Sequence, residues 1–161
     1  MTLHTALDAL IRFEERVCSF YVWLSSVVHD DAEVAQLFIT LAEQEQGHAE
    51  RLRMEQRALV DQERSIMVEG VDKAVESSVR AMDAFMEGAE HPSVLDALGF
   101  ALGLEADSGE QLGRHLLRDA VPELAKTLDG LDKEDAWHAE MMQECLAIRR
   151  RRATEFERQI G

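Results

Sequence analysis

Apolar residues recur in steps of three and four along most of this chain, which is the spacing that places side chains on one face of an α-helix. The first such stripe runs through Leu3, Leu7, Leu10, Glu14, Val17, Tyr21, Leu24 and Val28. The segment His29-Asp30-Asp31 then interrupts the pattern, and Asp30 or Asp31 is suited to cap the amino end of a second helix. The stripe of that helix runs through Val34, Phe38, Leu41, Glu45, His48, Leu52 and, less regularly, Leu59. We therefore expect the first two helices to form a hairpin.

A second pair of stripes lies in the carboxyl-terminal half. His91-Pro92-Ser93 is a strong signal for the start of a helix. The third stripe runs through Val94, Leu98, Ala101, Glu105, Ser108, Leu112 and Leu116. The segment Asp119-Ala120-Val121-Pro122 breaks it, and the fourth stripe runs through Leu124, Leu128, Leu131, Asp135, His138, Met142 and Cys145. These stripes predict a second hairpin, whose last helix continues past Arg149.

The two hairpins are joined by a long connection over about residues 63–91. Its apolar positions suggest one more amphipathic helix, which ends near Gly88. These positions are Val71, Val75, Val79, Met82 and either Phe85 or Met86. About 18 helical residues cover roughly 27 Å, enough to carry the chain back along a bundle. The pattern predicts an all-α four-helix bundle with a long helical crossover between helices 2 and 3, in a single domain spanning residues 1–161.

Four carboxylates and two imidazoles stand on stripes that are otherwise almost entirely apolar. Burying one ionised carboxylate without a partner costs several kcal/mol, more than a marginally stable domain tolerates four times over. Two divalent cations would balance four carboxylates, and two neutral histidines would complete the ligand set. The candidate metal ligands are Glu14, Glu45, His48, Glu105, Asp135 and His138.

The spacing of these residues indicates that they meet at one level of the bundle. Glu14 and Glu45 lie 31 positions apart, and the midpoint falls in the first interruption. Glu105 and Asp135 lie 30 positions apart, with a midpoint at Ala120. Positions equidistant from the turn of an antiparallel hairpin lie side by side. Each hairpin thus offers one carboxylate on its first helix and a carboxylate-x-x-histidine pair on its second, the arrangement of a carboxylate-bridged two-metal site.

Neighbouring acids of the same types lie off the stripes and are interpreted as solvated. They are Glu15, Glu43, Glu50, Glu110 and Glu134. Glu134 competes with Asp135 for the ligand role, but it lies about 100° round the helix from the stripe, so Asp135 is preferred. Tyr21, one helical level from Glu14, is expected to hydrogen-bond a site carboxylate. An ordinary core tyrosine is the alternative.

Composition narrows the classes of partner. The formal net charge of −15 disfavours nucleic acid and anionic membranes and attracts cations. Two cysteines without a CxxC pair exclude a disulfide framework and cysteine-ligated zinc or iron–sulfur modules. No stretch approaches the roughly 20 apolar residues that span a bilayer, and no basic start followed by an apolar run opens the chain. A cytoplasmic protein without a membrane partner is expected.

The segment FEERVCSFYVWLSSVVHDDAEVAQLFITLAEQEQGHAERL, with Glu14, Tyr21 and LAEQEQGH ending on His48, resembles the first metal-binding hairpin of the rubrerythrin-like branch of the ferritin-like superfamily. The second half resembles it less. ALGLEADSGEQL matches at Glu105, but Leu112 stands where the first half has Tyr21, and an aspartate replaces the usual glutamate before the last histidine. Ser108 stands where peroxide-reducing rubrerythrins tend to carry a further carboxylate.

This resemblance implies a ferritin-like, non-haem di-iron oxidoreductase that reacts with O2, peroxide or ferrous iron. Iron is the expected metal, with manganese or zinc as alternatives. Asp135, one methylene shorter than glutamate, is expected to be a terminal rather than a bridging ligand. The cysteine-rich rubredoxin domain of rubrerythrins is absent, so electrons would come from a separate donor protein. A homodimer is also implied. Bacterioferritins are similar in length and ligand types, but the long crossover suits them less.

Two other functions stay open at this point. One is a metal-binding or iron-storage module without turnover. The other is a helical interaction protein whose buried acids are protonated and hydrogen-bonded to the histidines. The arginine run at 149–152 suits the docking of an acidic redox partner, or else stabilises the carboxyl end of its helix and pairs with Glu155 and Glu157.

Overall fold

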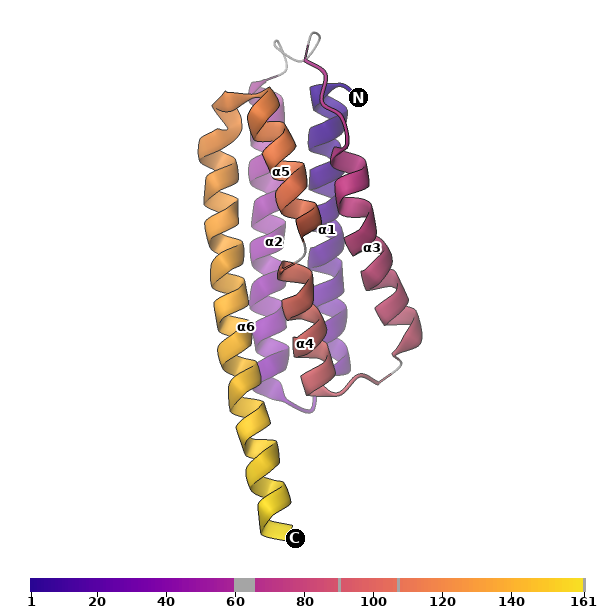
Figure 1. Ribbon diagram of the computed structural model, residues 1–161, viewed down its shortest axis with the longest axis vertical. Helices are drawn as coiled ribbons and strands as arrows, with labels where there is room; N and C mark the ends of the chain where they lie inside the picture. The colour runs from indigo at the N-terminus through magenta and orange to yellow at the C-terminus, as the bar shows by residue number, and fades with distance from the viewer. Residues whose placement is uncertain (60–65, 90, 107, 161) are drawn as a thin grey trace.

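The computed structural model is all-α over the part of the chain that it describes (Figure 1). It describes residues 1–59, 66–89, 91–106 and 108–160, and of Ser108, Glu157, Gln159 and Ile160 it describes the backbone only. Within these ranges there is no strand, and Thr2 and Met67 form one isolated antiparallel bridge. No described helix combines the length and the apolar character that crossing a membrane requires.

The first hairpin forms as the sequence predicts. Helix α1 spans Leu3–Val27 and helix α2 spans Ala32–Ala58, and the two pack along their length. Asp31 caps α2 because its carboxylate accepts a hydrogen bond from the Val34 amide at 3.2 Å. Every member of the first two predicted stripes is buried, so the apolar periodicity identified the inward faces correctly.

Helix α3 spans Val71–Gly88 and confirms the helix predicted in the crossover. It begins after Gly70, whose φ of 89° is accessible to glycine at little cost. The helix packs against α1 and α5 and returns the chain to the end of the bundle at which α4 starts (Figure 1). Residues 63–65 and 90 of the predicted crossover lie outside the described residues.

The third stripe is not one helix, and this prediction was wrong. Helix α4 spans Val94–Glu105, helix α5 spans Ser108–Ala120, and Ser93 caps α4 through a capping box with Asp96. Beyond the break the buried face of α5 is displaced by about one residue. Leu112 is 49% exposed, whereas Leu117 is fully buried. One residue corresponds to about 100° of helix rotation, so α5 turns a different set of side chains inward.

Two glycines let α5 approach its neighbours closely, Gly109 against the crossover helix α3 and Gly113 against α1. A Cβ on Gly109 would lie 2.3 Å from the Ala74 carbonyl oxygen, so no larger residue fits there without a shift of backbone. A Cβ on Gly113 would lie 3.2 Å from Leu10 Cδ2. The rotation of α5 is therefore fixed by backbone contact with α3 and by packing against α1.

The chain ends in helix α6, which spans Ala125–Ile160 after the short 3₁₀ turn Pro122–Leu124. Its carboxyl-terminal part projects beyond the bundle (Figure 1). Arg149 binds both carboxylate oxygens of Asp31, at 2.8 and 3.0 Å, and donates to Glu33 at 2.6 Å. The first arginine of the run at 149–152 therefore ties α6 to the amino end of α2. The expected pairing with Glu157 involves a side chain outside the described part.

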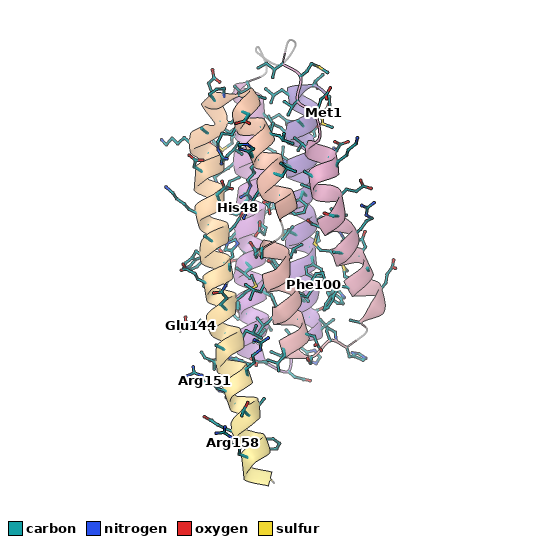
Figure 2. The ribbon with its side chains drawn as sticks, viewed as in Figure 1. Met1, His48, Phe100, Glu144, Arg151 and Arg158 are labelled. Atoms are coloured by element: carbon teal, nitrogen blue, oxygen red, sulfur yellow. The ribbon has the colours of Figure 1, made fainter. Side chains whose placement is uncertain are left out.

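Apolar side chains fill the interior on both sides of a polar level that includes His48 (Figure 2). Towards one end, the rings of Phe20, Phe85 and Phe100 join α1, α3 and α4, with 4.1 Å between the centroids of Phe85 and Phe100. Such packing excludes water from the space between the helices.

The close contact at Gly109 yields a stability test. Replacing Gly109 with alanine forces a Cβ into the Ala74 backbone and is expected to lower the free energy of unfolding by about 1–3 kcal/mol. Gly130→Ala, in α6 with no atom within 4 Å of its added Cβ, is the matched control. It is expected to raise that free energy by up to about 1 kcal/mol. Chemical denaturation measures both, and equal effects would contradict the proposed contact.

Candidate metal centre

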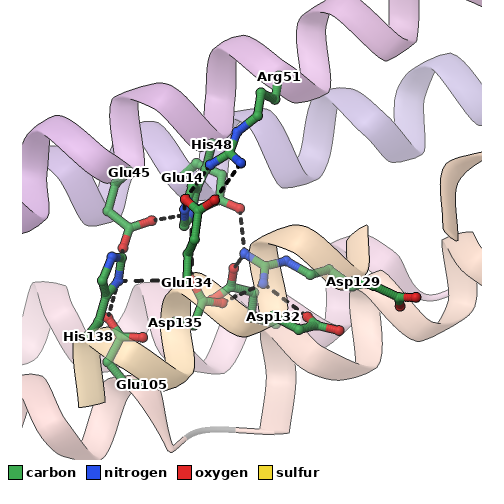
Figure 3. A network of polar contacts seen from close by, with 12 residues as sticks. Glu14, Glu45, His48, Arg51, Glu105, Asp129, Asp132, Glu134, Asp135 and His138 are labelled. Atoms are coloured by element: carbon green, nitrogen blue, oxygen red, sulfur yellow. Dashed lines mark hydrogen bonds and ion pairs between the residues drawn. The ribbon is translucent and has the colours of Figure 1, made fainter. Parts of the chain in front are cut away.

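The six sequence-predicted side chains converge inside the bundle, as Figure 3 shows. They come from four helices. Glu14 lies on α1, Glu45 and His48 on α2, Glu105 on α4, and Asp135 and His138 on α6. Glu14, His48 and His138 are fully buried, and the most exposed of the six, Asp135, has a side-chain exposure of only 13%. Four carboxylates and two imidazoles thus share one water-poor interior.

Two overlapping groups have the geometry to hold a metal ion. Glu14, Glu45 and His48 form one, and Glu45, Asp135 and His138 form the other. In each group the candidate ligand atoms lie within 4.8 Å of one another. Glu45 belongs to both, since its Oε2 lies 3.1 Å from His48 Nδ1 and its Oε1 lies 3.1 Å from His138 Nδ1. One carboxylate therefore spans the space between the two histidines.

Glu105 lies at the edge of these groups rather than in either. Its Oε1 is 3.7 Å from His138 Nδ1 and accepts a hydrogen bond of 2.5 Å from the Tyr21 hydroxyl. The hydrogen bond expected from Tyr21 to a carboxylate of the site is therefore present. Burial, followed by the charge of Glu105, raises the pKa of Tyr21 well above its usual value, so the hydroxyl stays a donor.

Several buried atoms of the site make no hydrogen bond. They are Glu14 Oε2, His48 Nδ1, and both ring nitrogens of His138. Three of them still face an opposite charge, because His48 Nδ1 lies 3.7 Å from Glu14 Oε2 and each Nδ1 lies 3.1 Å from an oxygen of Glu45. Among the described residues His138 Nε2 has neither kind of partner, and leaving such an atom unpaired away from water costs free energy that folding normally avoids. Carboxylate oxygens and imidazole nitrogens together suit iron, manganese and zinc. The residues therefore fit two divalent metal ions, with Glu45 between them.

Arg114 is the largest fully buried side chain of the site, and it was not predicted from the sequence. Its Nη2 donates to Glu14 Oε1 at 3.0 Å and also to Glu110, and its Nη1 donates to Asp132 at 3.1 Å and also to Asp135. A fully buried guanidinium is rare, and here it meets carboxylates from α1, α5 and α6. A cation of the protein itself thus offsets part of the negative charge.

Glu110 was interpreted as a solvated acid, and this was wrong. Its side chain is only 17% exposed and pairs with Arg114 one turn further along α5. The separation of four residues between a glutamate and an arginine was a signal available in the sequence. Whether that pair faces inward depends on the rotation of α5, which the break after Glu105 changes.

Glu134 was also interpreted as solvated, and the structure gives it a second role. Its side chain is 41% exposed, yet its Oε2 lies 3.1 Å from His48 Nε2. Arg51 holds both of its oxygens, at 2.7 and 2.5 Å, and these hydrogen bonds bring the pKa of Glu134 down to about 2. Glu134 therefore contacts the outer nitrogen of the imidazole whose inner nitrogen faces Glu45, a position that orients a histidine.

The pKa values of the site are shifted because its carboxylates and imidazoles lie close together away from water. Burial disfavours the imidazolium of His48, but the adjacent Glu14 and Glu45 outweigh burial and raise its pKa to about 10. Glu45 and Glu105 likewise overcome burial and raise the pKa of His138 to about 9. Burial raises the pKa of Asp135 to about 7 against the opposing charge of Arg114. Without a bound metal, protonated histidines supply positive charge to the cluster.

Comparison with known proteins gives no match among protein-family models, curated proteins or solved structures. The observations on the chain itself are a helical bundle and, in its described part, two buried groups of glutamate, aspartate and histidine with the geometry of metal ligands. Any function assigned to it must therefore follow from the chemistry of that site.

The raised pKa values predict that metal binding releases protons. At pH 7 both imidazoles are protonated in the metal-free protein, whereas an imidazole that binds a metal must be neutral. Loading the site at pH 7 is expected to release about two to three protons, one from each imidazole and a fraction from Asp135, and the affinity is expected to rise with pH up to about 9–10. Titration calorimetry with Co²⁺ in buffers of different ionisation enthalpy measures this number. Release of no proton would show that the imidazoles are already neutral.

A paired substitution distinguishes Asp135 from Glu134. Glu134→Gln removes a group that orients His48 and is expected to weaken metal binding about 10- to 100-fold with two ions still bound at saturation. Asp135→Asn removes a ligand and is expected to abolish binding of one ion. Glu140→Gln, an exposed position on the same helix, is the control. Equilibrium dialysis with Co²⁺ measures affinity and stoichiometry. The opposite ranking would make Glu134 the ligand.

Proposed function

We propose that this protein is a ferritin-like, rubrerythrin-type domain over residues 1–161 that holds two divalent metal ions, most naturally iron. We propose further that it acts as an oxidoreductase, reacting with O2 or peroxide or oxidising ferrous iron. One observation carries the proposal, namely two buried groups of ligand atoms within 4.8 Å of one another that share Glu45. The six predicted side chains would hold the two ions, and Glu45 is the one shared by both groups.

Two ferrous ions, when bound, would supply two electrons. The reduction of hydrogen peroxide to two molecules of water consumes two electrons and two protons. The chain's own contribution is to fix and shield the ligands. Tyr21 holds Glu105, and Glu134 holds His48, so neither ligand rotates freely. Buried residues one turn from the ligands, such as Leu41 and Met142, keep bulk water out.

Glu134 also connects the site to solvent. It is the half-exposed partner of fully buried His48, and Arg51, which holds it, lines a surface hollow of about 370 Å³ together with Met54 and Thr127. Its pKa of about 2 keeps this carboxylate ionised, so Glu134 remains the acceptor that orients His48 at the solvent side of the site. Electrons for repeated turnover come from a separate donor protein. A cytoplasmic location and a homodimer remain predictions.

The competing function is a helical interaction protein with no metal. One feature favours it, because Arg114 and two protonated imidazoles already provide three positive charges within the cluster. Against it stand the two groups whose ligand atoms lie within 4.8 Å of one another, and His138 Nε2, which makes no hydrogen bond. An ion network accounts for the contacts of Glu45 with the histidines but does not satisfy that nitrogen.

Anaerobic loading with Fe²⁺, followed by exposure to O2 or hydrogen peroxide, tests the proposal. The wild-type protein is expected to bind two Fe²⁺ per chain and to consume oxidant in proportion. Glu45→Ala, which removes the shared ligand, is expected to lose at least one ion and about 10²-fold or more of the oxidation rate. His138→Ala is expected to behave in the same way. Iron analysis and absorption spectroscopy measure both quantities.

Glu43→Ala, an exposed acid on the same helix as Glu45, is the control and is expected to match the wild type. A wild-type protein that binds no iron and keeps the same melting temperature on iron addition would overturn the proposal. Many irons retained per chain in a large assembly would instead establish storage, and two tightly bound ions without oxidant consumption would establish a non-catalytic metal-binding module.

A further inference from the structure

Arg114 binds two carboxylates of the site, one from each hairpin. It donates to Glu14 Oε1 at 3.0 Å and to Asp135 Oδ2. The remaining oxygens of the same carboxylates face the histidines, with Glu14 Oε2 at 3.7 Å and Asp135 Oδ1 at 3.6 Å from His48 Nδ1. Each carboxylate is therefore divided between an outer oxygen held by arginine and an inner oxygen directed into the site.

This division leaves Glu45 as the carboxylate with both oxygens towards the histidines. Asp135 Oδ1 lies between the two imidazoles, 3.6 Å from His48 Nδ1 and 4.0 Å from His138 Nδ1. Without Arg114, rotation of Asp135 would bring its second oxygen into the site as well. Figure 3 shows Glu14, Glu45, Asp135 and the two histidines gathered around this space.

The guanidinium of Arg114 is also shared with Glu110, which binds it from one turn earlier on α5. The positive charge that Arg114 adds to the cluster acts on every divalent ion alike. What Arg114 changes is the number of oxygens that an ion can reach.

We propose that Arg114 is a positioning residue that determines metal specificity, because it allows Glu14 and Asp135 to offer one oxygen each. This inference rests on the proposed two-metal site. Ca²⁺ requires six to eight oxygen ligands and commonly takes carboxylates through both oxygens. Transition-metal ions accept fewer ligands and favour imidazole nitrogen. The guanidinium thereby excludes Ca²⁺ and retains ions such as Fe²⁺ and Co²⁺.

Competition between Co²⁺ and Ca²⁺ tests the inference. The ratio of the two affinities is measured by titrating Ca²⁺ into the Co²⁺-loaded protein and following the visible absorption of Co²⁺. Both ions carry the same charge, so a change in local charge alters both affinities alike and leaves the ratio nearly unchanged. A change in the ratio therefore reports ligand geometry rather than overall electrostatics or stability.

Arg114→Met is expected to shift the ratio about 10- to 100-fold towards Ca²⁺, the range typical for partners that orient metal ligands. The double variant Arg114→Met/Glu110→Gln removes one positive and one negative charge together, and is expected to show the same shift if the single variant does not fold. Arg114→Lys, which keeps the charge but loses the two-pronged contact, is expected to fall between.

Arg118→Met is the matched control, because Arg118 lies one turn along α5 and pairs with Asp129 and Asp132 rather than with a ligand. Its ratio is expected to equal that of the wild type. Displacement of Co²⁺ from the wild type by a modest excess of Ca²⁺, or equal ratios in the wild type and the Arg114 variants, would overturn this inference alone. A wild type that binds neither ion would overturn the proposed function as well.

Discussion

The structure depends on the burial of negative charge between helices. Four carboxylates sit where apolar side chains would otherwise complete the core, and no amount of surrounding hydrophobic packing removes the cost of taking an ionised group out of water. Each must therefore find a cation or a proton. Three kinds of positive charge can neutralise these carboxylates. They are the protonated histidines of α2 and α6, the guanidinium of Arg114 and the proposed metal ions. The raised pKa of His48, to about 10, shows how strongly the carboxylates attract positive charge.

The second hairpin meets this requirement differently from the first. In the first, α1 and α2 are continuous and give Glu14, Glu45 and His48 from regular helical faces. In the second, the helix breaks after Glu105, and the rotated segment α5 brings Glu110 and Arg114 against the carboxylates. The crossover helix α3 contributes indirectly, because its contact with Gly109 fixes the rotation of α5. The break between α4 and α5, which the first hairpin lacks, thus places Arg114 in the site. It is the only arginine that is fully buried in the described part of the chain.

Much of the site was predictable because it repeats a simple relation between spacing and turns. Residues at equal distances from a hairpin turn lie side by side, and a carboxylate three residues before a histidine shares its helical face. These rules brought all six residues together. They did not predict that Glu134 contacts His48, because this contact joins α6 to α2 and depends on the distance between those helices. Glu110 was misplaced for a related reason, since a one-residue displacement decides whether it is solvated or buried.

The sequence by itself determined the helices of the first hairpin, the crossover helix and the last helix, together with their inward faces. It also determined the turns of the two hairpins and the level at which six polar residues meet. These are consequences of periodicity and of distance along the chain, which local propensity and the hydrophobic effect enforce before distant segments pack. Only the tertiary structure decided the rotation of α5 and, with it, the entry of Arg114 into the site. That rotation follows from close packing between helices distant in sequence, where the absence of a side chain at Gly109 lets one backbone approach another. Nothing in the spacing of apolar residues encodes such a contact.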